Sequence, residues 1–211
     1  MSLRDTRIDY TKGTLEDDSK NENPIDIFNN WIGLAKKDVE KDYNAMALST
    51  QGLDGFPVTR IVLLRGMKDE GLVFYTNYES DKGKEIAENA KVSVNFFWRE
   101  LEKQIRVNGM AKKLDPSISD SYFASRPRKS QIGAWVSDQS TIITSRAELT
   151  EKERELQQRF EGKEVPRPEY WGGYVIQPEA YEFWQGRSGR LHDRLKFKLT
   201  DGKWMADRLS P

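Results

Sequence analysis

Val92-Ser93-Val94-Asn95-Phe96-Phe97-Trp98 and Gln104-Ile105-Arg106-Val107-Asn108-Gly109-Met110-Ala111-Lys112-Lys113-Leu114 are the two neighbouring stretches that decide the fold. The first is rich in β-branched and aromatic residues, and the second contains the β-branched Ile105 and Val107; such residues are typical of strands. Similar runs precede them at Ala45 to Ser49, Val58 to Leu64 and Leu72 to Asn77, with turn residues at Gly52 to Gly55 and Lys68 to Gly71. These short spacings favour antiparallel neighbours in a barrel over strands joined by crossover helices.

Helical patterns flank and interrupt the strands. Apolar residues recur at three- and four-residue spacing from Pro24 and predict an amphipathic helix that ends near Lys41. Further helices are expected from Ser80, as the N-cap, to about Asn89, from Ser117 to Ser125, and from Arg146 to Phe160 with Leu149, Leu156 and Phe160 inward. Strand signals return at Gly173 to Ile176, Tyr181 to Trp184, Leu191 to Leu199 and Lys203 to Leu209. The pattern therefore predicts a mainly β, α+β, antiparallel single domain over residues 24–211, preceded by a polar, flexible arm at 1–23.

Composition excludes several classes of protein. The chain has 211 residues, 34 basic and 34 acidic side chains, no cysteine and one histidine. A net charge of zero provides no global field for nucleic acid or an anionic membrane, and the missing thiols exclude disulfides and thiolate metal sites. No metal centre is expected from a single histidine. Since no apolar run approaches the ~18 residues of a membrane span, we expect a cytoplasmic protein without nucleic-acid or membrane partners.

The one histidine, His192, lies in the segment from Trp184 to Arg194, which also contains three arginines. Histidine titrates near neutrality, and arginine recognises phosphate or carboxylate with a planar fork, so this segment indicates an anionic ligand beside a proton-handling group. The chain has no dinucleotide fingerprint, P-loop or nucleophile elbow. Cationic and amide side chains instead gather at strand ends and loops, and the helix start at Ser80, with Lys82 and Thr76, is a plausible phosphate cradle. Together they favour recognition of two phosphorylated ligands.

Six ordered blocks resemble the pyridoxine/pyridoxamine 5′-phosphate oxidase family. They are Arg60 to Arg65 (RIVLLR), Val73 to Asn77 (VFYTN), Ser125 to Ser137 (SRPRKSQIGAWVS), Glu182 to Gly186 (EFWQG), Arg190 to Arg194 (RLHDR) and Asp207 to Pro211 (DRLSP). The resemblance extends from about Arg7 to the last residue. It implies an FMN-binding split β-barrel that works as a homodimer with FMN at the interface. The implied reaction oxidises pyridoxamine or pyridoxine 5′-phosphate with O2 to pyridoxal 5′-phosphate and hydrogen peroxide, with ammonia released from the amine.

The resemblance also implies roles for individual residues. FMN contacts carry over to Arg60, Ile61, Val62, Leu63, Leu64, Arg65, Tyr75, Thr76, Lys82, Gln104, Gln139, Ser140, Trp184 and Arg194. Substrate contacts carry over to Arg65, Tyr122, Arg126, Ser130, Arg190, Leu191 and His192, and Arg7 to Tyr10 would form a lid over the bound substrate. Arg190 is expected to orient the substrate above the flavin, and His192 to form a hydrogen bond or handle a proton near the pyridine ring. The carboxy-terminal segment would contribute to dimerisation.

Two positions depart from the family pattern. Arg65 stands where lysine is common, and arginine also binds phosphate. Asp81 stands where a cation usually faces the FMN phosphate. We expect its carboxylate to turn outward and to stabilise the helix N-terminus, the alternative being a weaker flavin site.

Other interpretations stay open from the residues alone. The same fold supports a flavin or nitro-group reductase that uses a nicotinamide donor, and a non-catalytic module that binds flavin or pyridoxal phosphate. Trp135 is more simply a core residue, Arg126 and Arg128 could form surface ion pairs, and Arg7 to Tyr10 could be a disordered tail. The Arg126-to-Ser130 loop together with Arg190, Leu191 and His192 favours the oxidase, because a flavin carrier does not need a second phosphate pocket.

Overall fold

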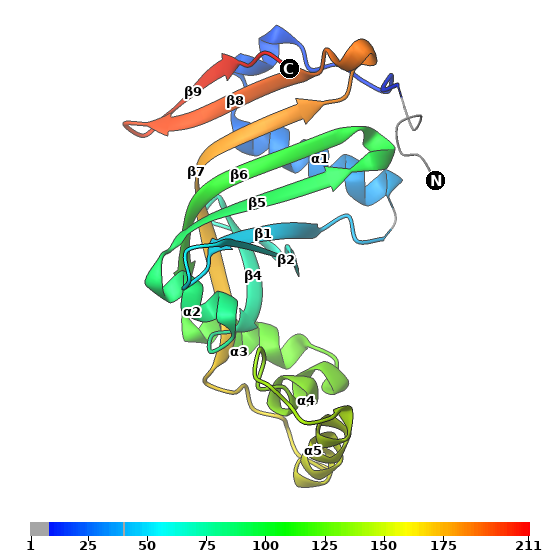
Figure 1. Cartoon of the computed structure of the whole chain (residues 1–211), viewed down its shortest axis with the longest axis vertical. Helices are drawn as coiled ribbons and strands as arrows, with labels where there is room; N and C mark the ends of the chain where they lie inside the picture. Colours follow the sequence, from blue (N-terminus) through cyan, green and yellow to red (C-terminus); the bar gives the residue numbers. More distant parts are fainter. Residues whose placement is uncertain (1–8, 40) are drawn as a thin grey trace.

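A computed structural model describes residues 9–39 and 41–211 (Figure 1). The described residues form one antiparallel sheet with the order β2-β1-β5-β6-β7-β4-β3, and β8 and β9 extend it from the second half of β7. The strands are β1 (Ala45–Gln51), β2 (Pro57–Leu63), β3 (Gly66–Lys68), β4 (Gly71–Asn77), β5 (Lys91–Trp98), β6 (Lys103–Lys113), β7 (Trp171–Gln185), β8 (Asp193–Thr200) and β9 (Lys203–Arg208). The helices are α1 (Pro24–Asp38), α2 (Asp81–Glu88), α3 (Pro116–Ser125), α4 (Arg128–Val136) and α5 (Arg146–Arg159). The prediction of a mainly β, antiparallel fold with flanking helices is confirmed.

The main core lies between the curved sheet and α1. Pro24 occupies the first helical turn and the Asn23 side chain accepts a hydrogen bond from the Ile25 amide, so the start of α1 is fixed as the sequence predicts. The buried face of α1 places Phe28 edge-on against Phe96 at 5.6 Å and Trp31 against Phe183 at 5.4 Å between ring centroids. These aromatic contacts hold α1 across β5 and β7.

A second, smaller core joins α3, α4 and α5 at the far end of the molecule (Figure 1). Phe123 of α3, Ile132 of α4 and Leu156 of α5 are buried there, together with Trp171 at the start of β7. The prediction of an Arg146 helix with Leu149, Leu156 and Phe160 inward is confirmed, because Leu156 and Phe160 are buried and the half-buried Leu149 packs against this core. This layer holds the helices against one end of the sheet.

The structure corrects the sequence prediction in four places. Gly173 to Ile176 and Tyr181 to Trp184 belong to one strand, β7, in which a register shift opposite Asn108 and Gly109 absorbs an extra residue. The segment after Pro127 is a helix, α4, which was not predicted as one. A short strand, β3, pairs with β4 in place of a simple turn. Helix α1 ends at Asp38, and the predicted end near Lys41 was too late.

Residues 9–23 lie against the sheet. Leu15 is buried, its amide donates to the Asp193 carboxylate at 3.1 Å, and its carbonyl accepts from Arg208 at 2.7 Å. A short 3-10 helix follows at Asp17–Asn21, where Asp17 pairs with Arg208. Residues 1–8, which include Arg7, lie outside the described residues. No helix of the described chain is long and apolar enough to cross a membrane.

Candidate active site

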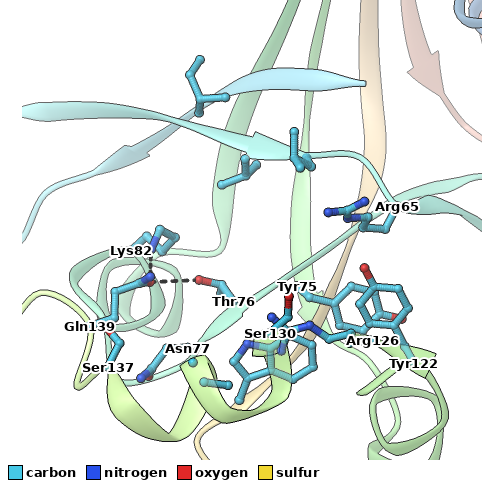
Figure 2. Close-up of a pocket in the computed structure, with 16 residues that line it drawn as sticks. Arg65, Tyr75, Thr76, Asn77, Lys82, Tyr122, Arg126, Ser130, Ser137 and Gln139 are labelled. Carbon is cyan, nitrogen blue, oxygen red and sulfur yellow. Dashed lines mark hydrogen bonds between the residues drawn. The ribbon is translucent and has the colours of Figure 1, made fainter. Parts of the chain in front are cut away.

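A cavity of about 440 Å³ opens between the sheet and the helical layer. It is framed by β2 and β4 on one side and by α2, α3 and α4 on the other (Figure 2). Eleven of the residues that the resemblance assigned to FMN or substrate line it: Ile61, Val62, Leu63, Arg65, Tyr75, Thr76, Lys82, Tyr122, Arg126, Ser130 and Gln139. The cavity therefore unites segments that lie far apart in the sequence.

One end of the cavity is a cationic cradle at the start of α2. Ser80 caps the helix by accepting from the Gly83 amide, and Lys82 in the first turn donates to Gln139 Oε1 at 2.6 Å (Figure 2). Thr76 at the end of β4 donates to the same oxygen at 3.3 Å. Burial lowers the pKa of Lys82, and neighbouring Arg60 lowers it further. A cation that burial has partly desolvated, beside the positive end of a helix, is suited to a phosphate.

Gly83 allows this helix start to lie close to the preceding turn. A Cβ atom added there would stand 2.0 Å from the Tyr78 carbonyl oxygen, which no side chain tolerates. Asp81 is exposed, and its backbone amide donates to Ser140 Oγ at 3.3 Å. This position is compatible with the outward orientation expected for the Asp81 carboxylate, and it brings Ser140 to the cradle.

Arg60 lies beside the cradle and does not line the cavity. Its guanidinium forms an ion pair with the buried Glu85 carboxylate at 2.7 Å and also contacts the Thr50 hydroxyl. Glu85 in turn accepts a hydrogen bond from Thr50 at 2.5 Å. Leu64 also differs from the expectation of direct contact with the cavity, because its side chain is buried in the core. Arg60 therefore contributes positive potential near Lys82 without lining the cavity, and Glu85 of α2 fixes the position of its guanidinium.

The opposite end of the cavity is cationic and aromatic. The rings of Tyr75 and Tyr122 stack with centroids 3.8 Å apart, and Trp171 continues the stack at 5.5 Å from Tyr75. The Arg126 guanidinium lies over the Trp171 ring at 4.5 Å, and its Nη1 is buried without a hydrogen-bond partner in the described chain. Burial lowers the pKa of Arg126, and Arg65 nearby lowers it further. An orphaned guanidinium nitrogen facing a cavity indicates an anionic ligand.

A second group of assigned residues lies at the other end of β7. Strand pairing puts Gln104, Trp184 and Arg194 side by side across β6, β7 and β8. Arg194 is held by Glu182 at 2.7 Å and by the Ser210 carbonyl at 2.9 Å. His192 packs on Trp184 with 4.7 Å between ring centroids. The structure thus places these assigned residues side by side, and β8 begins at Asp193, two residues later than the expected strand start at Leu191.

The remaining assigned residues of this cluster differ in exposure. His192 Nδ1 accepts a hydrogen bond from the Arg187 amide at 3.1 Å, which leaves Nε2 to carry the proton of a neutral ring. The Tyr10 ring lies edge-on to Trp184 at 5.6 Å and to His192 at 5.8 Å. Leu191 is 72% exposed, and Arg190 is exposed in a left-handed backbone conformation with φ 63°. Both are accessible to a ligand or to another chain.

The two clusters do not meet within one chain. Trp171 marks the cavity end of β7 and Trp184 marks the other, and at roughly 3.3 Å per residue the strand separates them by about 40 Å along its length. Figure 1 shows β7 running between the helical layer and the β8–β9 hairpin. A site that uses both clusters consequently needs a second copy of the chain.

Sequence reasoning missed several residues that line the cavity, above all Trp171, Asn77, Gly133, Ala134 and Ser137. Trp171 carried a usable signal, because Gly172 and Gly173 follow it and indicate close approach by neighbouring groups. A Cβ at Gly172 would indeed stand 2.1 Å from the Tyr78 hydroxyl. Gly133 and Ala134 carried no such signal, since they face the cavity only because α4 is a helix.

The half-barrel fold and a cavity with two cationic ends define the class of split-barrel flavoproteins. The family model described as pyridoxamine 5′-phosphate oxidase matches residues 35–160, and the model of the pyridoxine 5′-phosphate oxidase C-terminal dimerisation region matches residues 171–211. The chain belongs to the pyridoxamine 5′-phosphate oxidase family. It is an FMN-dependent oxidase that forms a homodimer.

Relatives support this over the full length. The chain is 45% identical to a pyridoxine/pyridoxamine 5′-phosphate oxidase of Synechocystis, covering 100% of this chain and 99% of that protein. It is 47% identical to one of Flavobacterium johnsoniae, covering 99% and 98%. The crystal structure of PhzG from Burkholderia lata, in complex with tetrahydrophenazine-1-carboxylic acid, matches with TM-score 0.86 at 29% identity, covering 94% and 98%. The split-barrel fold and the family resemblance are thereby confirmed.

Proposed function

We propose that this enzyme oxidises pyridoxamine 5′-phosphate and pyridoxine 5′-phosphate to pyridoxal 5′-phosphate, with O2 as the electron acceptor. The substrate loses two electrons and two protons, and O2 takes them up to form hydrogen peroxide. Hydrolysis of the oxidised amine releases ammonia, whereas the alcohol gives the aldehyde directly. The observation that carries this proposal is the cavity with Lys82 at one end and Arg126 at the other, because two phosphate esters need two separate cationic anchors.

The cradle at the start of α2 is proposed as the FMN phosphate site. Lys82, Thr76, Gln139 and Ser140 converge there, and Arg60 supports them from the ion pair with Glu85. When bound, FMN supplies the two-electron redox chemistry, and the chain supplies position and electrostatics. Ile61 to Leu63 would line the flavin side of the cavity.

The aromatic end is proposed as the substrate phosphate site. Arg126 offers its unpartnered Nη1, with Ser130, Tyr122 and Arg65 around the same end of the cavity. The stacked rings of Tyr75 and Tyr122 form a wall of the cavity at the same end as the Arg126 guanidinium. The buried Nη1 without a partner among the described residues supports a ligand-binding role for Arg126 over the surface ion pair that the residues alone allowed.

The second cluster is proposed to complete the site from the partner chain. Trp184, Gln104 and Arg194 would then face the flavin, while Arg190, Leu191 and His192 would lie over the pyridine ring. Because His192 Nδ1 accepts from the Arg187 amide, Nε2 is the nitrogen that can donate a hydrogen bond to the substrate, and no covalent role of His192 is required. Closed two-fold symmetry would form two equivalent sites per dimer. Residues 24–211 would act as one domain, with Tyr10 from the arm packed on the His192 side.

The test is direct oxidation of both esters. Purified protein should carry FMN, and addition of either ester in air should give equal amounts of pyridoxal 5′-phosphate and hydrogen peroxide. Under anaerobic conditions the ester alone should reduce the bound flavin. Reduction by a nicotinamide donor but not by the esters would support the reductase alternative, and retention of ligand without peroxide would support a binding module.

The PhzG structure suggests one further control. That protein binds a carboxylic acid that carries no phosphate, as its name states. Because Arg126 and Ser130 would then lack a phosphate partner, we expect this chain to prefer the phosphorylated pyridine. A cytoplasmic location, which the cysteine-free composition favours, remains part of this proposal.

A further inference from the structure

We propose that Glu102 is a positioning residue that anchors the described start of the amino-terminal arm, residues 9–12, against the His192 side of the active site. The catalytic consequence of this inference rests on the proposed function, whereas the contacts between Glu102 and the amino-terminal segment do not. Glu102 does not line the cavity, and it lies at the turn that joins β5 to β6.

The anchor is a carboxylate aimed at two backbone amides. Glu102 is only 6% exposed, and its Oε2 accepts the amide of Thr11 at 2.7 Å and that of Lys12 at 2.8 Å. Both distances are typical of charge-assisted hydrogen bonds, which stabilise a contact more than neutral ones. Two successive amides converging on one oxygen fix the direction of the segment as well as its position.

The same residue is tied to the end of β7. Its backbone carbonyl accepts from the Gly186 amide at 2.8 Å and from Gln185 Nε2 at 3.2 Å. Its backbone adopts a left-handed conformation with φ 53°, which is uncommon for a residue with a side chain. This conformation directs the carboxylate to the arm while the carbonyl stays on the strand end that carries Trp184.

The position of the Tyr10 ring follows from this anchor. It directly precedes Thr11, and its ring packs on both Trp184 and His192. Gly186 makes this contact possible, because a Cβ atom there would lie 2.7 Å from both Cβ and Cγ of Tyr10. Glu102 from one side and Gly186 from the other thus define where Tyr10 lies.

Glu102 has no cationic partner in the described part of the chain. Lys12 directs its ammonium to the Glu100 carbonyl, and Lys103 directs its own to Gln185. A buried carboxylate is costly unless hydrogen bonds compensate it, and the compensation here comes from the two arm amides. The burial of Glu102 is therefore coupled to docking of the arm.

The experiment compares Glu102→Ala with Glu102→Gln and with Glu100→Ala as the matched control. Glu100 is an exposed residue on the same turn. It contacts the arm through its backbone carbonyl, which accepts from Lys12 and is unchanged by the substitution. Hydrogen exchange is measured at the Thr11 and Lys12 amides in the FMN-loaded dimer, together with KM and kcat for pyridoxine 5′-phosphate and the Kd for FMN.

We expect Glu102→Ala to speed exchange at both amides by about tenfold or more, because hydrogen bonds to a charged acceptor are lost. KM should rise by a similar factor, about tenfold, while the Kd for FMN changes less than about twofold. Glu102→Gln retains an acceptor oxygen and should recover most of both losses, and Glu100→Ala should match the wild type. Gly186→Ala displaces Tyr10 but leaves the Glu102 side chain in place, and it should raise KM in the same way.

Unchanged exchange at Thr11 and Lys12 in Glu102→Ala would overturn the anchor. Faster exchange with an unchanged KM would overturn its role in substrate binding, as would a parallel loss of FMN. If Glu102→Ala does not fold, Glu102→Asp replaces it under the same criteria, because its shorter side chain withdraws the acceptor oxygen from both amides and aspartate tolerates the left-handed backbone. If the wild type leaves both esters unoxidised, the proposed function fails, but the exchange data still decide the anchor.

Discussion

Replacement of Arg126 by lysine tests the substrate end of the cavity. Lysine keeps the positive charge but lacks the planar fork, so the substitution separates charge from geometry. The guanidinium lies 4.5 Å from the Trp171 ring centroid and 5.5 Å from that of Phe123, and its buried Nη1 has no hydrogen-bond partner among residues 9–39 and 41–211. Both the contact with the aromatic rings and the contact that the free nitrogen can make with a ligand would be weakened.

The expected magnitude follows from these two losses. A cation held over an aromatic ring contributes about 0.5–2 kcal/mol, and a hydrogen bond to a charged group contributes about 1.5–3 kcal/mol. Since lysine keeps part of each interaction, we expect a loss of about 2–4 kcal/mol in transition-state binding, which is roughly 30- to 1,000-fold in kcat/KM. The loss should appear mainly in KM, because the phosphate is bound in the ground state as well.

The assay is steady-state oxidation of pyridoxine 5′-phosphate at saturating FMN, with FMN affinity measured separately. Arg126 lies at the opposite end of the cavity from Lys82, so the Kd for FMN should change less than about twofold. Lys129→Ala removes an exposed cation from α4 and serves as the matched control. A loss below about threefold in kcat/KM, or an equal loss of FMN, would refute the assignment of Arg126 to the substrate phosphate.

Three further predictions use other parts of the structure. Arg190→Ala should lower turnover far more than FMN occupancy, and equal losses in a flavin-retention assay would indicate a structural role instead. Asp81→Arg should change the FMN Kd by less than about tenfold because Asp81 is exposed; a tenfold tightening in a fluorescence titration would show that its carboxylate faces the phosphate. Burial lowers the pKa of Lys103 to about 8, so above that pH the unfolded state binds more protons than the folded one and this group adds stability as pH rises toward 10. The unfolding free energy of wild type minus that of Lys103→Met should therefore increase between pH 8 and 10, and a flat or falling difference in denaturant titrations would contradict the shift.

Local signals explain how much of the fold was predictable. Ser80 was placed correctly as an N-cap because a serine before a helical run has one strong use, and its hydroxyl accepts the Gly83 amide as expected. Helix α4 was missed because Gly133 and the β-branched Ile132 and Val136 weaken its helical pattern, while packing of α4 on α5 stabilises it. The division of β7 into two strands had a different cause, since Pro178 near its middle usually ends a strand and here sits at a register shift.

The site was predictable only in part, because contact between distant segments leaves no local signal. Strand register could not be inferred, although it is what aligns Gln104, Trp184 and Arg194. The side-chain partners of the site residues could not be inferred from the sequence either. Arg60 was expected at FMN itself, but its ion pair with Glu85 depends on how α2 packs on β1 and β2.

The pairing of charges distinguishes the two clusters further. In the described chain, Arg65, Lys82 and Arg126 around the cavity form no salt bridge, whereas Arg187, Arg194 and Arg208 at the other end of β7 pair with Asp193 or Glu182. Unpaired cations around the cavity favour the binding of an anion. The cluster of paired charges at the other end of β7 instead favours the binding of an uncharged ring with hydrogen-bonding edges. Arg190 is the exception in the second cluster, because it is exposed and makes no salt bridge among the described residues. Of the two clusters, the one around the cavity thus holds the cations that are free to bind the two proposed phosphates.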